Sequence, residues 1–258
     1  MNNSPIGVFD SGMGGLSVWR ELRRTMPEES LVYMADGKNC PYGNRPPEEL
    51  REYVFAATEE LLRRDIKLLI VACNTATAVA IASLREHYKI PIVGMEPAVK
   101  PAALSSHTGV IGILATRASL DGDLFRNTCA YYDSRIKILS AVGEGFVEAV
   151  ENGRERSPET LELVRRAVEP LIEGGADKIV LGCTHYPFLT EAVRQVIGDR
   201  KVDIVDPAPA IVRRTAWLLD SNSLRAECGH KADYSFVTFA GDDYLEKITC
   251  RALRLAQE

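Results

Sequence analysis

An apolar run that ends in a cysteine occurs twice in this chain of 258 residues. The cysteines occupy positions 73 and 183, which are 110 residues apart. The same shift brings Glu96-Pro97-Ala98 onto Asp206-Pro207-Ala208, and a shift of 105 residues brings residues 6–11 onto residues 111–116. Because the three matches follow in the same order, they predict a duplication, and the chain is expected to fold as two similar halves.

Strand and helix patterns alternate along both halves. Short apolar runs indicate strands, and apolar residues recurring near every 3.6 positions indicate helices. Alternation with short connections is typical of parallel sheets with helices on both faces. Strands are expected near residues 5–10, 31–35, 68–73, 91–94, 110–114, 136–139, 178–183 and 234–239. Helices are expected near residues 16–24, 48–64, 78–81, 120–129, 144–151, 158–172 and 208–219, after Pro187 and at the C-terminus, with a loop at 40–47.

The predicted fold class is therefore α/β, with two pseudo-symmetric parallel-sheet domains and the active site in the cleft between them. The first domain comprises residues 1–97, completed by the C-terminal tail 210–258, and the second comprises residues 98–209. The links near Pro97 and Pro207 are expected to form the hinge.

Charge and hydropathy exclude several classes of partner. The net charge of −5 disfavours a nucleic-acid-binding surface. No apolar run reaches the roughly 20 residues that span a bilayer, so no membrane partner is expected. The N-terminus lacks a signal-peptide apolar region, which makes the cytoplasm the expected compartment. The oligomeric state stays open, with a homodimer as one option.

The six cysteines are far apart and follow no metal-ligand or CxxC spacing. That pattern disfavours a disulfide framework and a structural zinc site, so no metal is expected. Cys129, Cys228 and Cys250 are interpreted as buried and inert.

Cys73 and Cys183 fall where α/β proteins bind ligands, at the carboxyl ends of strands. Asp10, Ser11 and Thr116 are expected at such ends as well. If the two domains face each other, one thiolate could remove a proton from a carbon while the opposing thiol delivers one to its other face. A helix starting after each cysteine would favour the thiolate. Asp10 and His185 are candidate proton partners, and the substrate carboxylate would be met by polar groups of Ser11, Asn74, Thr75 and Thr184.

Other interpretations stay open for these residues. A single cysteine at a strand end is often structural, and His185 could cap the helix that follows. The segment Asp10 to Gly15 could cradle a phosphate, although it lacks the GxGxxG order and no P-loop lysine is present. A non-catalytic nucleotide- or ligand-binding protein and a redox role for the thiols are therefore the alternatives from other classes.

Several motifs resemble those of the glutamate racemases, in the cofactor-independent aspartate/glutamate racemase superfamily. They are residues 9–18, 41–43, 72–76, 182–187 and 205–207, and they extend over nearly the whole chain. The opening Phe9-Asp10-Ser11-Gly12-Met13-Gly14-Gly15 favours the glutamate enzymes over their aspartate relatives. A racemase for aspartate or another amino acid is the nearer alternative.

The resemblance implies a cofactor-free isomerase that interconverts L- and D-glutamate and supplies D-glutamate for peptidoglycan. Cys73 would act on the D-enantiomer with help from Asp10, and Cys183 on the L-enantiomer with help from His185. The family's assisting glutamate would be Glu151, in a segment that departs from the family pattern. The substrate pocket would be lined by Asp10, Ser11, Pro41, Tyr42, Gly43, Asn74, Thr75, Thr116, Thr184 and His185.

Overall fold

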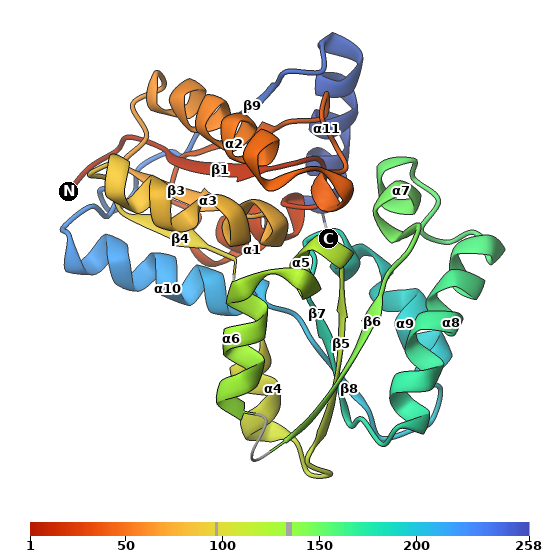
Figure 1. Cartoon of the computed structure of the whole chain (residues 1–258). Coiled ribbons are helices and arrows are strands. Elements are labelled where there is room, and N and C mark those ends of the chain that lie inside the picture. Colours follow the sequence, from red (N-terminus) through yellow and green to blue (C-terminus); the bar gives the residue numbers. More distant parts are fainter. Residues whose placement is uncertain (96–97, 133–135, 258) are drawn as a thin grey trace. The chain divides into compact units, whose positions relative to one another are not determined.

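The computed structural model describes residues 1–95, 98–132 and 136–257 (Figure 1). The chain divides into two compact units: Met1–Met95 with Ala208–Glu258 form unit 1, and Glu96–Pro207 form unit 2. Glu96 and Pro97, at the expected first link, lie outside the described residues. The expected second boundary, at 209/210, falls just inside helix α10, which begins at Ala208. No described helix is both long and apolar enough to cross a bilayer.

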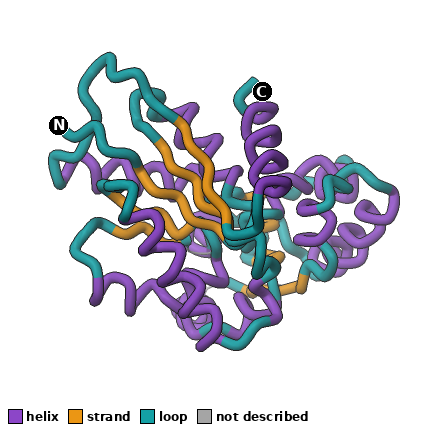
Figure 2. Tube along the Cα trace, turned by 90° about the horizontal axis from the view of Figure 1, so that it is seen from above, coloured by secondary structure: helices purple, strands orange, loops and turns teal. Residues whose placement is uncertain are grey.

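Unit 1 is built on a five-stranded sheet in the order β4-β3-β1-β2-β9, with every pair parallel. Its strands are β1 (Ile6–Asp10), β2 (Leu31–Ala35), β3 (Leu68–Val71), β4 (Ile92–Gly94) and β9 (Tyr234–Thr238), which Figure 2 shows side by side in orange. Every residue of β1 to β4 is buried, as expected for a parallel sheet covered on both faces.

Helices cover both faces of this sheet. On one face α2 (Pro47–Leu62) packs against α3 (Asn74–His87), and on the other α1 (Leu16–Thr25) packs against α10 (Ala208–Ser221) (Figure 1). The last helix, α11 (Asp242–Leu255), contacts β9 and α1. Because the chain moves from β1 to β2 in one direction along the sheet and from β2 back to β3 in the other, right-handed crossovers are expected to place helices on both faces.

Unit 2 has a four-stranded parallel sheet in the order β6-β5-β7-β8. Its strands are β5 (Val110–Ala115), β6 (Lys137–Val142), β7 (Lys178–Leu181) and β8 (Asp203–Val205). On one face, α4 (Val99–Ser105) packs against β5, β7 and α6 (Asp123–Tyr132); on the other, α8 (Pro158–Glu173) packs against β5, β6 and α9 (Thr190–Ile197). The short helices α5 (Arg117–Asp121) and α7 (Phe146–Glu151) follow β5 and β6.

The two sheets repeat one strand order, because β4-β3-β1-β2 corresponds to β8-β7-β5-β6. The hydrogen bonds just beyond the central strands also correspond. Ala72 N donates to Phe9 O at 2.7 Å in unit 1, and Gly182 N donates to Leu114 O at 2.7 Å in unit 2. The doubled parallel α/β architecture predicted from the internal repeat is therefore present, and its strand ends match in detail.

Some local predictions are wrong and others are refined. The single helix expected over 120–129 is two, α5 and α6, separated at Gly122. The helix expected after Pro187 is α9, which begins at Thr190, and Pro187 itself lies in a four-residue 3-10 helix, η2 (Tyr186–Leu189). The expected loop at 40–47 contains one 3-10 turn, η1 (Tyr42–Asn44). Cys228 and Cys250 are exposed and Cys129 is partly exposed, so the expectation that these three are buried is wrong.

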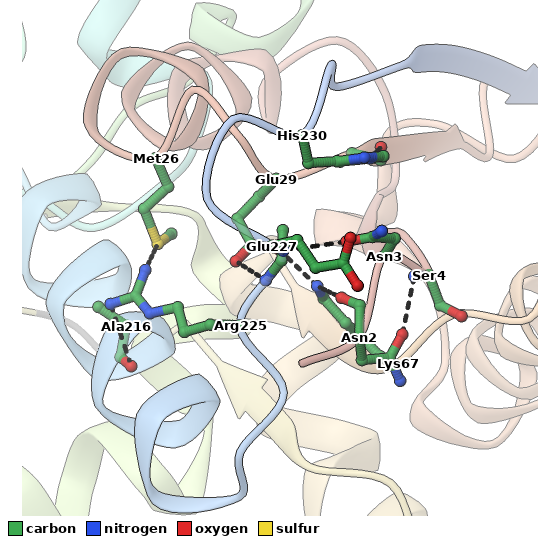
Figure 3. Close-up of polar contacts among 12 residues, drawn as sticks. Asn2, Asn3, Ser4, Met26, Glu29, Lys67, Ala216, Arg225, Glu227 and His230 are labelled. Atoms are coloured by element: carbon green, nitrogen blue, oxygen red, sulfur yellow. Dashed lines mark hydrogen bonds and ion pairs between the residues drawn. The ribbon is translucent and has the colours of Figure 1, made fainter.

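A polar network closes the amino end of the unit 1 sheet (Figure 3). Lys67, just before β3, lies 2.6 Å from Glu29 Oε2 and donates to Asn2 O at 2.6 Å. The other oxygen of Glu29 accepts from Ala226 N at 3.1 Å, and Asn2 N donates to Arg225 O at 2.8 Å. Both charged side chains are almost fully buried. Because Glu29 also accepts a hydrogen bond from Ala226, the ion pair links the connector between α10 and β9 to the edge of the sheet.

Candidate functional site

Cys73 follows strand β3, which pairs with β1, the central strand of unit 1. Since β1 and β3 pair in register, with Phe9 opposite Val71, the residues that follow both strands meet at one edge of the sheet. Cys73 Sγ lies 3.7 Å from Ser11 Oγ, and both residues are buried. The adjacency of Cys73 and Ser11 follows directly from the parallel pairing.

Cys73 is also the N-cap of α3. Its backbone is extended, and its sulfur accepts a hydrogen bond from Ala76 N at 3.4 Å. A sulfur that receives a backbone N–H at the start of a 14-residue helix is stabilised as the thiolate, because the helix end carries partial positive charge. The sequence-based expectation of a helix start at Cys73 is confirmed.

Asp10 ends β1 and is completely buried. Its Oδ1 accepts from Gly12 N at 2.8 Å, so the glycine-rich turn folds back over its carboxylate. A Cβ on Gly15 would lie 2.7 Å from Asp10 Cβ, and Tyr33 OH donates to Gly12 O at 2.7 Å. Gly15 therefore allows close packing against Asp10, which accounts for this glycine without a phosphate ligand.

Asn74 and Thr75 form the first turn of α3, and both are buried. Among the described residues, neither Nδ2 nor Oδ1 of Asn74 has a hydrogen-bond partner. A buried amide with unmade hydrogen bonds costs about 1–3 kcal/mol of stability. Such a group is expected to have a binding role, with a ligand supplying the missing partner.

Pro41, Tyr42 and Gly43 lie in the segment that follows β2. The Cys40–Pro41 peptide bond is cis, and Tyr42 is buried with its hydroxyl 2.7 Å from Asp36 Oδ2. Burial raises the pKa of Tyr42 far above its ordinary value, and the negative charges of Asp36, Cys73 and Asp10 raise it further. Tyr42 is therefore a neutral phenol at physiological pH.

The second cysteine has different surroundings, within unit 2. Cys183 follows β7, and Thr116 follows the neighbouring β5, where its side chain caps α5 by accepting from Ser119 N at 3.3 Å. Thr184 is buried beside Cys183. The expectation of a helix start after Cys183 is wrong, because the next α-helix begins seven residues later.

The group next to the Cys183 thiol is the imidazole of His185, not the start of an α-helix. Its Nδ1 lies 3.8 Å from Cys183 Sγ, and its Nε2 lies 2.6 Å from Glu151 Oε1. The carboxylate favours the tautomer with the proton on Nε2, in which Nδ1, the nitrogen that faces the thiol, is the proton acceptor. Glu151 ends α7, so the imidazole bridges a carboxylate and a sulfur that are 32 positions apart in the chain.

Two supporting residues were not singled out from the sequence. Tyr186 OH lies 3.4 Å from Gly143 O, and a Cβ on Gly143 would overlap the Tyr186 hydroxyl. Burial raises the pKa of Tyr186 well above its ordinary value, as does the neighbouring Cys183. Asp36 follows directly after β2, the same strand-end position that drew attention to Asp10.

The candidate residues thus form two groups. The first half-site, in unit 1, contains Asp10, Ser11, Pro41, Tyr42, Gly43, Cys73, Asn74 and Thr75. The second half-site, in unit 2, contains Thr116, Glu151, Cys183, Thr184 and His185. Each holds one buried cysteine at the carboxyl edge of its sheet, with proton-transfer partners of a different kind.

Comparisons with known proteins agree on one family. The model of the Asp/Glu/hydantoin racemase family matches residues 6–215. A glutamate racemase of Roseiflexus sp. (strain RS-1) is 48% identical over 221 residues, which cover 85% of this chain and 81% of the relative. The crystal structure of a glutamate racemase isoform from Bacillus anthracis superimposes with a TM-score of 0.89 at 32% identity, covering 98% of this chain and 95% of that one. The Escherichia coli glutamate racemase, in complex with L-glutamate and the activator UDP-MurNAc-Ala, gives a TM-score of 0.86 at 33% identity over 97% and 95% of the two chains.

Proposed function

Because the chain belongs to the Asp/Glu/hydantoin racemase family, we propose that it is a glutamate racemase that interconverts L- and D-glutamate without a cofactor. The observation that carries the proposal is the pair of equivalent strand ends, each presenting a buried cysteine with its own means of holding or passing a proton. Two thiols of this kind are what a two-base inversion at the α-carbon requires.

In the first half-site, Cys73 exchanges the α-proton of D-glutamate. A free thiol with a pKa near 8.5 is only a few per cent ionised at pH 7, so forming the thiolate costs about 2 kcal/mol. The first turn of α3 reduces this cost through the Ala76 N–H. Asp10, close behind the same strand edge, assists the proton transfer.

In the second half-site, Cys183 exchanges the α-proton of L-glutamate. His185 Nδ1 takes the thiol proton, and Glu151 stabilises the imidazolium that forms. When the reaction runs toward L-glutamate, the Cys183 thiol delivers its proton to carbon, and the imidazolium then returns a proton to the Cys183 thiolate. The His185–Glu151 pair thus lowers the cost of forming the Cys183 thiolate, as the start of α3 does for Cys73.

The carbanion formed between the two transfers needs stabilisation at the substrate carboxylates. Pre-oriented N–H and O–H groups provide it without reorganisation at the moment of reaction. The amide of Asn74 is suited to this role because its hydrogen bonds are unmade among the described residues. Ser11, Thr75, Thr116, Thr184 and the segment Pro41–Gly43 supply further polar groups from both half-sites. The mechanism requires that the two half-sites act on opposite faces of one α-carbon.

Exchange of the α-hydrogen tests the two-base mechanism. In heavy water, each enantiomer should at early times yield an inverted product carrying deuterium, while the remaining substrate keeps its hydrogen. Cys73→Ala and Cys183→Ala should each abolish racemisation measured by circular dichroism, whereas Cys250→Ala, at an exposed position, should leave it unchanged. Near-normal turnover by either active-site variant would exclude this mechanism.

The choice of substrate is tested with a panel of L-amino acids. Initial rates by circular dichroism should be highest with L-glutamate. A higher rate with L-aspartate, or with another amino acid, would assign the chain to that substrate and leave the two-thiol chemistry intact.

The product, D-glutamate, is a component of peptidoglycan, and we place the enzyme in the cytoplasm, where reducing conditions keep both thiols available. A thiol reagent that does not cross membranes should label the enzyme in lysed cells and leave it unlabelled in intact cells. A homodimer stays a prediction, and light scattering coupled to size-exclusion chromatography decides it.

A further inference from the structure

The segment between β2 and α2 carries Pro41, Tyr42 and Gly43, and it is folded around one buried carboxylate. Asp36 begins this segment and has no exposed surface. Its Oδ2 accepts from Tyr42 OH at 2.7 Å, and both its oxygens accept from Asn39 Nδ2, at 3.1 and 3.0 Å. A single side chain thus holds the segment on both sides of the Cys40–Pro41 bond.

Asp36 is also joined to the first half-site through the backbone. Its N–H donates to Asp10 O at 3.0 Å, so the start of the segment is fixed to the end of β1. Tyr42 lies in the same hydrophobic cluster as Cys73 and Phe9. The hydrogen bonds of Asp36 therefore connect one catalytic candidate, Asp10, with Tyr42, whose side chain lies in the same cluster as the other, Cys73.

Further contacts close the segment into a compact loop. Arg45 Nε donates to Asn39 O at 2.7 Å, and Arg45 N donates to Tyr42 O at 3.1 Å. On the other side, a Cβ on Gly37 would overlap the ring of Tyr244, so α11 packs directly against the loop backbone. Arg45 thus adds hydrogen bonds to those that Asp36 makes within the loop, and Tyr244 of α11 packs against the loop from outside.

A buried carboxylate is costly unless it is well hydrogen-bonded. The described hydrogen bonds to the Asp36 side chain come from neutral donors, an amide and a phenol. Apolar side chains at both 36 and 42 would fill the same space without that cost, so fold stability alone does not account for the pair of carboxylate and phenol. What it does provide is direction, because the phenol proton of Tyr42 is committed to Asp36 and the Tyr42 oxygen is held in one place.

We propose that Asp36 is a positioning residue for substrate binding, which holds the loop 36–45 in its binding conformation before the substrate arrives. This inference rests on the proposed function, because it takes Pro41, Tyr42 and Gly43 as substrate contacts. If the loop holds this conformation only a tenth of the time without Asp36, KM rises about tenfold while kcat changes little.

The test uses Asp36→Asn, Tyr42→Phe and the double variant. Each single change should raise KM about tenfold for both enantiomers, and the double variant should be no worse, because the two side chains act through one hydrogen bond. Since the equilibrium constant of racemisation is one, kcat/KM must fall equally for L- and D-glutamate, which checks the data internally. Tyr88→Phe is the matched control: its hydroxyl donates to Glu59, near the end of α2 that is far from the loop, and its KM should stay at the wild-type value.

Hydrogen–deuterium exchange gives a second measurement that does not depend on activity. Backbone amides of residues 39–45 should exchange about tenfold faster in Asp36→Asn and in Tyr42→Phe, with β1 and β3 unchanged. Wild-type KM in both single variants, a fall in kcat at constant KM, or a loss of thermal stability with unchanged loop exchange would each overturn the inference. If the wild-type protein racemises no amino acid while the two variants show the predicted faster exchange, the proposed function is refuted and the role of Asp36 in holding the loop still stands.

Discussion

Replacing Glu151 with glutamine tests whether the charge of Glu151 supports proton transfer by His185. The change keeps the shape of the side chain and removes the charge that faces His185 Nε2 across 2.6 Å. A hydrogen bond to a charged partner contributes about 1.5–3 kcal/mol. If that stabilisation applies in the transition state, kcat/KM falls by about 10- to 150-fold. Because racemisation has an equilibrium constant of one, the fall must be the same from either enantiomer.

Isotope effects show which of the two proton transfers is slowed. Glu151 and His185 assist Cys183, which exchanges the α-proton of L-glutamate. In Glu151→Gln this proton transfer at Cys183 should therefore become rate-limiting. With α-deuterated L-glutamate the carbon–deuterium bond breaks in that slow step, and the isotope effect on kcat/KM should rise. With α-deuterated D-glutamate the same bond breaks earlier, at Cys73, and the isotope effect should fall.

The assay is the initial rate of racemisation by circular dichroism, with protiated and deuterated forms of each enantiomer. Glu148→Gln is the matched control, because Glu148 is an exposed glutamate one turn earlier on α7, and its kcat/KM should stay near the wild-type value. A near-wild-type rate for Glu151→Gln would refute the relay. So would a larger isotope effect from the D-enantiomer than from the L-enantiomer.

Three further changes test other parts of the structure. Asn74→Ala should raise KM about tenfold or more without lowering the thermal unfolding temperature, because the amide has no hydrogen-bond partner among the described residues; a loss of stability would contradict that. Lys67→Met should lower the free energy of unfolding in urea by about 3–5 kcal/mol, since it leaves Glu29 buried without its cation, and adding Glu29→Gln should restore part of the loss. Burial raises the pKa of Asp177, but hydrogen bonds from Ser106 and the next two backbone amides outweigh this and hold it below its ordinary value. Asp177 therefore stabilises the fold above about pH 4 and loses this effect as the pH falls through the lowered pKa, so Asp177→Asn should be less stable than wild type at pH 7 and converge with it in acid.

The strands could be predicted from the sequence because parallel strands buried on both faces are uninterrupted apolar runs. Residues 68–71 and 179–181 are of this kind, and in both cases a cysteine follows two positions after the end of the strand. The strand order also repeats as the internal repeat suggested, since equal patterns of strands and crossovers pack in equal ways.

Helix boundaries were less predictable where turns compete with helix. Gly122 separates α5 from α6 within a stretch whose apolar pattern is continuous. After Cys183 the chain forms a 3-10 turn through Pro187, and the first regular helical turn comes only at Thr190. Proline favours the start of a helix, but its presence does not specify whether the first turn is α or 3-10.

The contacts between distant residues could be predicted least. The spacing of Cys183 and His185 suggested a pair, whereas nothing local relates Glu151 to His185; only the resemblance to a family pointed to Glu151. Asp36 was not selected from the sequence, and its partners become evident only once the loop is folded.

The path of the chain through unit 1 has a consequence for the order of synthesis. Unit 2 is one uninterrupted stretch, so all of its sheet has been made before α10 begins. Unit 1 is finished only when β9 pairs with β2, which happens after residue 238 has been added. Until then β2 is an open sheet edge, able to pair with other chains. A ribosome that stalls within the connector from α10 to β9 therefore leaves a nascent chain with a complete second unit and a first unit whose sheet is still open at β2.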